Sequence, residues 1–148
     1  MELAERVMSR DALAWHYRQM ARRAWAAVGE ASGPVPLKPL CYALRAALAT
    51  LWLERAPNLP PMSLAALLAG ARVVEEVRAA AQALVERKAT GDERATGPCD
   101  PALAALIRAQ LAPTPPRPAP IRPSAEAIAL AEGLFHDALG VASPLRSR

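Results

Sequence analysis

The sequence predicts an all-α protein, a bundle of about five helices followed by a proline-rich linker and one trailing helix. Apolar residues recur three or four positions apart along most of the chain, the spacing of one helix face. Alanine, the strongest helix former, supplies much of the 53% hydrophobic content, whereas aromatic residues make up only 4%. No segment of five residues alternates apolar and polar side chains with β-branched enrichment, so we expect no strand.

The first helix is expected to begin at Glu2, or after an N-cap at Ser9, and to end near Val28, because Gly29 and a proline-containing turn follow. Its predicted apolar face consists of Leu13, Tyr17, Met20, Ala24 and Ala27.

A second helix is predicted from Leu37 to about Arg55, with Pro39 in the first turn, where proline is tolerated. After a proline-rich turn, Ser63 is a suitable N-cap for a short third helix that ends at Gly70.

A fourth helix is predicted from Ala71 to about Ala89, closed by Gly91. Its inner face is expected to comprise Val73, Val77, Ala80, Leu84 and Lys88, the last with its charged end reaching solvent. Asp100 and Pro101 are typical of a helix start, and the fifth helix is expected to bury Leu103, Leu106, Ile107 and Leu111.

Three regions follow from this pattern: a helical bundle over 1–111, a linker over 112–123 and a trailing segment over 124–148. Prolines are too dense in the linker for a helix, so we expect an extended, polyproline-like spacer. The last helix should run from Ser124 to about Leu139, either docked on the bundle or bound to another chain.

Composition narrows the class of protein. Cys41 and Cys99 show no CxxC spacing. The first residues do not resemble an export signal, and no apolar run is long enough to span a membrane. These observations predict a cytoplasmic protein with two free thiols. His16 and His136 lie in separate segments without clustered ligands, so no metal site is expected. The formal charge of +4 is compatible with a nucleotide or RNA partner, but on composition alone a solvated surface without a partner explains it better.

The second helix carries an unusual stripe beside its apolar face. Its members, spaced four, three, four and three apart, are Lys38, Tyr42, Arg45, Ala49 and Trp52. Because alanines and leucines flank Arg45, its guanidinium should be partly desolvated and should require an anion. That anion is either a protein carboxylate or a ligand phosphate, since a guanidinium fork suits both.

The first helix offers a second candidate surface. His16 and Arg23 lie seven residues apart on one face, with Gln19 between them, and these side chains are able to contact a phosphate or a base edge; an exposed polar face explains them as well. Arg10 and His16 also match an Arg-x5-His spacing that resembles the ribonuclease motif of helical HEPN domains.

Motifs for phosphoryl-transfer chemistry are absent from the sequence. There is no glycine-rich phosphate loop and no Asp-x-Asp pair to hold magnesium ions. The adjacent acidic residues Glu75 and Glu76 point to neighbouring faces of a helix and are expected to be solvated. We therefore assign no catalytic residue and no metal ligand.

A series of short motifs occurs in a fixed order along the chain: His16-Tyr17, Met20-Ala21-Arg22, Lys38, Tyr42-Ala43-Leu44-Arg45, Leu48-Ala49, Trp52, Pro60-Pro61, Glu86-Arg87-Lys88, Gly91-Asp92-Glu93 and Pro101-Ala102-Leu103. This ordered series resembles the C-terminal helical part of the predicted nucleotidyltransferases of the RNA-repair-pathway DNA-polymerase-β-like family. The likeness extends from Ser9 to Leu111. The resemblance implies a partner domain that carries the Gly-Ser turn and the paired aspartates, together with Mg²⁺ and a nucleoside triphosphate in the complete enzyme.

The resemblance also implies roles for individual residues. Lys38 and Arg45 would neutralise phosphate charge, Tyr42 or Trp52 would pack against the base or the domain interface, and His16 would line the same cleft. The chain would then be a fragment, a split subunit or a degenerate remnant of a nucleotidyltransferase. The alternatives are a protein–protein interaction module that binds no nucleotide, and a HEPN-like ribonuclease that uses Arg10 and His16.

Overall fold

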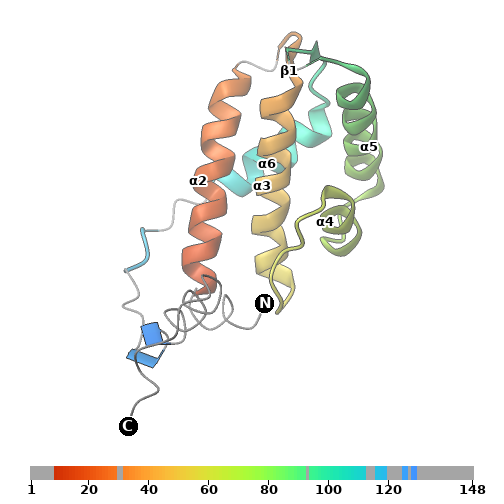
Figure 1. The fold of residues 1–148 in the computed structure, drawn as a ribbon. Coiled ribbons are helices and arrows are strands. Elements are labelled where there is room, and N and C mark those ends of the chain that lie inside the picture. The colour runs from red at the N-terminus through yellow and green to blue at the C-terminus, as the bar shows by residue number, and fades with distance from the viewer. Residues whose placement is uncertain are drawn as a thin grey trace, which may run out of the picture. The chain divides into compact units, whose positions relative to one another are not determined.

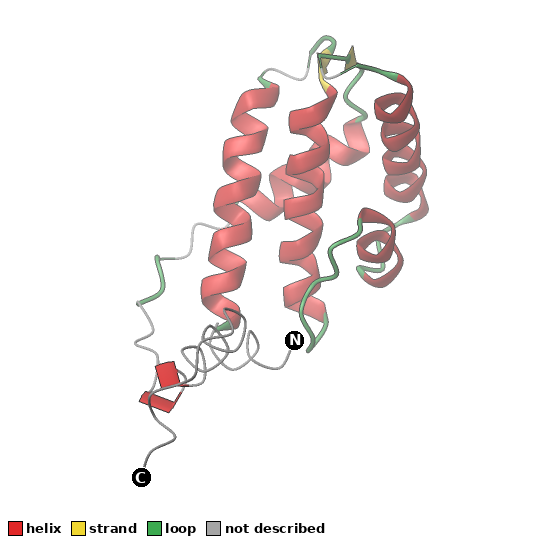
Figure 2. Ribbon diagram, viewed as in Figure 1, coloured by secondary structure: helices red, strands yellow, loops and turns green. Residues whose placement is uncertain are grey.

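The all-α class is confirmed by a computed structural model of the chain (Figures 1 and 2). The structure describes residues 9–29, 32–92, 94–112, 116–119, 125–126 and 128–129. One compact unit comprises Arg10–Pro118, and a second comprises Met1–Ser9 with Ala119–Arg148. In the second unit residues 125–126 and 128–129 are helical. The remainder of the predicted last helix lies outside the described residues, as do residues 1–8 and most of the proline-rich linker.

The described part of the first unit contains five helices and two short strands. The helices are α2 (Arg10–Val28), α3 (Leu37–Arg55), α4 (Leu64–Gly70), α5 (Glu75–Thr90) and α6 (Pro101–Leu111), and the strands are β1 (Val35–Pro36) and β2 (Thr96–Gly97). The predicted bounds of α3 and α4 and the predicted start of α6 are confirmed. None of the described helices has the combination of length and apolarity that a membrane crossing requires.

The core is built around α3, which buries residues on most of its circumference. Leu40, Leu44 and Leu48 are completely buried. In Figure 1, α2 runs antiparallel beside α3, α6 crosses behind the pair, and α4 and α5 lie on the other side of α3. The helix α6 contacts α2, α3 and α5. Because α3 is enclosed from several directions, few of its side chains reach the surface.

Helix starts follow local side-chain chemistry where a cap is present. The Ser63 hydroxyl accepts a hydrogen bond from the Ala66 N–H at 3.0 Å, and the Asp100 carboxylate accepts one from the Ala102 N–H at 2.8 Å. These bonds satisfy N–H groups that a helix start leaves without partners. The predicted start of α5 at Ala71 is wrong, because Arg72 adopts a left-handed conformation with φ 49° and the helix begins only at Glu75.

The predicted inner face of α2 is also partly wrong. Met20 is 42% exposed, whereas Ala21 is fully buried. Ala27 is exposed, and Val28 is buried in its place. The small Ala21 side chain suits the close contact between α2 and α3 better than the longer Met20.

The expectation that no strand would form is wrong for four residues. Val35 pairs with Gly97 and Pro36 with Thr96 in an antiparallel ladder. The ladder is extended by a hydrogen bond from the Leu37 N–H to the Ala95 carbonyl at 3.0 Å. A two-residue pairing between distant segments leaves no alternation pattern in the sequence. It joins the start of α3 to the connection between α5 and α6.

Candidate functional site

A groove between α3 and α5 collects most of the stripe predicted on the second helix. Its volume is about 510 Å³. The lining residues are Lys38, Cys41, Tyr42 and Arg45 from α3, Leu64 from α4, and Val85, Lys88 and Ala89 from α5. We refer to these eight residues as the α3–α5 groove.

Helical spacing brings the polar groups of the groove together. Lys38, Tyr42 and Arg45 are four and three residues apart and therefore share one face of α3. On α5, Lys88 lies one turn after the buried Leu84. Residues one turn apart share a helix face, so Lys88 is on the face of α5 that packs toward α3. The β1–β2 pairing lies beside this region, because β1 leads directly into α3.

The groove is cationic. Three of its lining residues carry a positive charge, and no carboxylate is among the eight. The Arg45 guanidinium contacts the Met62 Sδ atom at 3.7 Å. In the described part of the chain neither Arg45 nor Lys88 pairs with a carboxylate. Positive charges held close together on facing helices create a local positive potential that attracts anions.

Apolar side chains accompany these cations. Tyr42 is 53% exposed and Val85 is 44% exposed, and both line the groove. Met62, which contacts Arg45, is 75% exposed. Three of the six large hydrophobic side chains that are exposed among the described residues therefore lie at this one place.

The half-buried Cys41 is one of the residues that line the same groove. Burial raises the pKa of the Cys41 thiol above its ordinary value of 9.0, while the Lys88 ammonium acts in the opposite direction. Cys99 lies outside the groove, and burial likewise raises the pKa of its thiol, against a smaller opposing effect of Arg108. Both cysteines are free, as predicted.

Trp52, at the far end of the predicted stripe, does not line the groove. Its indole N–H donates a hydrogen bond to the Asn58 carbonyl at 3.1 Å. Its ring lies so close to Gly70 that a Cβ atom at that position would overlap it. The structure therefore gives Trp52 a packing role between α3 and the end of α4. Ala49, the remaining member of the stripe, is buried.

His16 and Arg23 are both exposed on α2, and neither lines the groove. The His16 ring meets the Tyr17 ring edge-on, with centroids 5.9 Å apart. The structure thus separates His16 from the groove, although the family resemblance implies a common cleft. The physical reason is the orientation of α2, whose packed face carries Leu13, Ala21 and Val28 instead.

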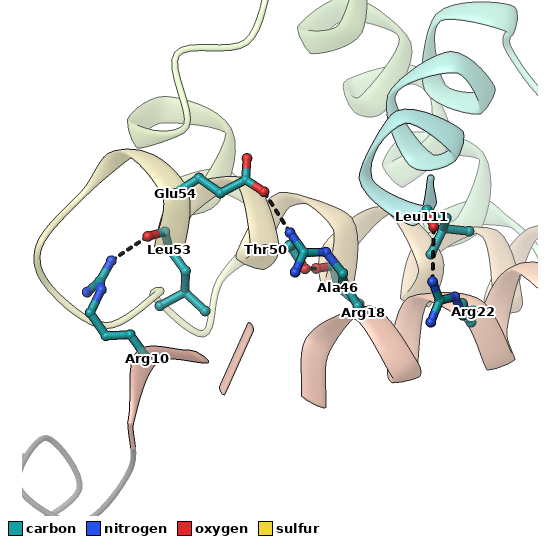
Figure 3. A network of polar contacts seen from close by, with 8 residues as sticks. All are labelled: Arg10, Arg18, Arg22, Ala46, Thr50, Leu53, Glu54 and Leu111. Atoms are coloured by element: carbon teal, nitrogen blue, oxygen red, sulfur yellow. Dashed lines mark hydrogen bonds and ion pairs between the residues drawn. The ribbon is translucent and has the colours of Figure 1, made fainter. Parts of the chain in front are cut away.

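The other basic residues of α2 hold the bundle together (Figure 3). The Arg10 guanidinium donates hydrogen bonds to the carbonyls of Leu53, Ala56 and Pro57, at the C-terminal end of α3. These contacts satisfy carbonyl groups that have no partner within the helix, and a positive charge there complements the helix dipole. The guanidinium that a ribonuclease motif would use is therefore occupied by a structural role.

Further arginines bridge α2 to neighbouring helices. Arg18, whose side chain is 12% exposed, forms an ion pair with Glu54 of α3 at 2.9 Å. Arg22 donates to the Leu111 carbonyl at the end of α6 at 3.1 Å. Arg108 lies over the Trp25 ring at 5.4 Å, a cation–π contact between α6 and α2. These arginines are accounted for by the fold.

Sequence reasoning missed the contribution of α5 to the groove. The sequence pattern predicts Lys88 on the inner face of that helix, but only as a side chain whose charged end reaches solvent. Its position one turn beyond Leu84 was the available signal. No group of three or more potential metal ligands occurs within the described residues.

The comparison with known families agrees with the resemblance noted in the sequence. The model of the RNA repair pathway DNA polymerase beta family matches residues 1–137. No curated protein and no solved structure matches the chain significantly.

Proposed function

Because the chain belongs to the RNA repair pathway DNA polymerase beta family, we propose that it is the helical accessory part of a nucleotidyltransferase. In this proposal the α3–α5 groove holds the phosphates of a nucleotide or of RNA. The chain contributes binding, and a separate catalytic domain contributes the transfer chemistry.

The observation that carries the proposal is the charge arrangement of the groove. Arg45 and Lys88 face a common space and have no carboxylate partner among the described residues. By contrast, Arg10, Arg18 and Arg22 have carbonyl or carboxylate partners within the bundle. Cations that the fold does not use for its own packing are available to a ligand. Charge-assisted hydrogen bonds to phosphate are stronger than neutral ones and suit a guanidinium fork.

The assignment of binding to this chain and of transfer chemistry to a separate domain follows from the motifs in the sequence. A Gly-Ser turn for a triphosphate and an Asp-x-Asp pair for magnesium are absent from the sequence. The groove does not suit a divalent cation either, because three positive charges and no carboxylate line it. We therefore assign magnesium binding to the catalytic domain, which we propose as the partner of this chain.

Titration calorimetry on the full chain tests the proposal, with ATP and a ten-nucleotide oligouridylate as the probes. Replacing Arg45 by glutamine removes a charge-assisted contact, and we expect the affinity for whichever probe binds to fall by about tenfold or more. Circular dichroism should show unchanged helicity, since the described contacts of the guanidinium are limited to Met62.

Arg78→Gln is the matched control. Arg78 lies on α5 like Lys88, but it pairs with Glu75 at 3.4 Å and does not line the groove. This variant should bind as the parent chain does. Absence of binding by the parent chain to both probes, or equal affinity of the Arg45→Gln and parent chains, would overturn the proposal.

A further inference from the structure

We propose that the α3–α5 groove takes a segment of single-stranded nucleic acid at least two nucleotides long, with one base stacked on Tyr42. This inference rests on the proposed function and specifies its ligand. It distinguishes a strand from a lone nucleoside triphosphate.

The first support is the spacing of the cations along α3. Lys38 and Arg45 are seven residues apart, which corresponds to about 10 Å along a helix axis. The phosphates of a single triphosphate share bridging oxygens and lie closer together than this. Successive phosphates of a strand are separated by a ribose, so a strand matches the two ends of the row better. Lys88 adds a third charge from the facing helix.

The second support is the aromatic ring between those two cations. Tyr42 follows Lys38 by four residues and precedes Arg45 by three, so its ring lies midway along the charged row. The side chain is 53% exposed and forms no hydrogen bond within the described part of the chain. An exposed ring inside a positively charged groove is the arrangement on which proteins stack the bases of single strands.

The third support is the apolar surface beside the ring. Val85 lines the groove from α5, and Met62 contacts the Arg45 side chain. Exposed apolar groups that gather at one place commonly mark a binding surface. The flat face of a base covers such groups without requiring a hydrogen bond from them. A strand requires binding positions for phosphates and bases in alternation, whereas a nucleoside triphosphate does not.

The lining also predicts low sequence selectivity. None of the eight lining residues is Asn, Gln, Asp or Glu, the side chains that read adenine and cytosine edges. Binding through phosphates and base faces should therefore depend strongly on salt and discriminate little between adenine and cytosine.

Fluorescence anisotropy with the full chain tests the inference. Its probe is a labelled ten-nucleotide oligouridylate, and UTP, a dinucleotide and a tetranucleotide are its competitors. We expect the tetranucleotide to compete at about tenfold lower concentration than UTP, because it engages cations at both ends of the row. Tyr42→Ala should weaken oligonucleotide binding by roughly fivefold to a hundredfold, the range measured for loss of a stacked base.

Tyr42→Phe is the matched control, because it keeps the ring and should retain the parent affinity. Both Tyr42 variants should keep the parent melting temperature, since the side chain is exposed. Equal competition by UTP and the tetranucleotide, or equal affinity of the Tyr42→Ala and parent chains, would overturn the inference. If Arg45→Gln abolished UTP binding and Tyr42→Ala left it unchanged, the proposed function would stand and only the inference of a bound strand would be refuted. Failure of every probe to bind would remove both.

Discussion

At the scale of single residues, the basic side chains fall into two groups that composition cannot separate. Arg10, Arg18 and Arg22 form hydrogen bonds or ion pairs within the bundle. Arg45 and Lys88 instead face the α3–α5 groove. The formal charge of +4 is the balance of 18 basic and 14 acidic residues and does not distinguish the two groups. Only the contacts show which charges are available to a ligand.

Cys41 provides a test at this scale, because its thiol lies in the groove. Burial raises its pKa above 9.0, so the reactive thiolate is scarce near neutral pH, and alkylation should accelerate as the pH rises toward and beyond that value. With saturating oligouridylate we expect iodoacetamide to modify Cys41 several times more slowly than in the free protein. Peptide mass spectrometry over a time course measures this rate.

Cys99 is the internal control for that experiment. Its thiol is also half-buried and its pKa is also raised by burial, but it does not line the groove. Its modification rate should be the same with and without oligonucleotide. Equal protection of both cysteines would indicate a general stabilisation of the fold and would contradict binding at the groove.

At the scale of elements, local signals predicted those helices that begin at strong caps. Ser63 and Asp100 fixed the starts of α4 and α6, and both form the expected hydrogen bonds. The start of α5 was missed, because the left-handed residue Arg72 has no distinctive neighbour in the sequence. The β1–β2 pair was missed because it depends on the tertiary approach of two segments.

The contact of Trp52 with α4 yields a prediction about Gly70. A methyl group at this position would overlap the Trp52 ring, so Gly70→Ala should lower the free energy of unfolding by about 1–3 kcal/mol. Urea denaturation followed by circular dichroism measures the change. Oligonucleotide affinity of the folded variant should be retained, since Trp52 lies outside the groove.

Gly33→Ala is the control for this substitution. No atom lies within 4 Å of a Cβ built at Gly33, and we expect its effect to remain within about 0.5 kcal/mol. A Gly70→Ala variant as stable as Gly33→Ala would contradict the packing role of Trp52. Loss of affinity in the folded Gly70→Ala variant would instead restore Trp52 as a ligand-binding residue.

At the scale of the whole molecule, the sequence predicted half of the candidate site. The spacing of Lys38, Tyr42 and Arg45 identified one wall correctly as a shared face. The other wall was not predictable, because Arg45 and Lys88 are 43 residues apart and meet only through packing of α5 against α3. Helical periodicity also does not reveal that His16 and Arg23 on α2 lie outside the groove.

The family match and the groove give the chain a coherent role at this scale. The match extends over residues 1–137, beyond the region in which short motifs had been recognised. We propose that the catalytic domain supplies metal ions and transfer chemistry, and that the helical chain holds the nucleic acid strand. The binding contribution is the part that this chain alone can demonstrate.

The most direct measurement is an NMR titration of the ¹⁵N-labelled full chain with the ten-nucleotide oligouridylate. We expect the largest amide shifts between Lys38 and Arg45 on α3 and between Val85 and Ala89 on α5, the segments that line the groove. Largest shifts around His16 and Arg23 on the exposed face of α2, or the absence of shifts at saturating oligonucleotide, would contradict binding in the groove.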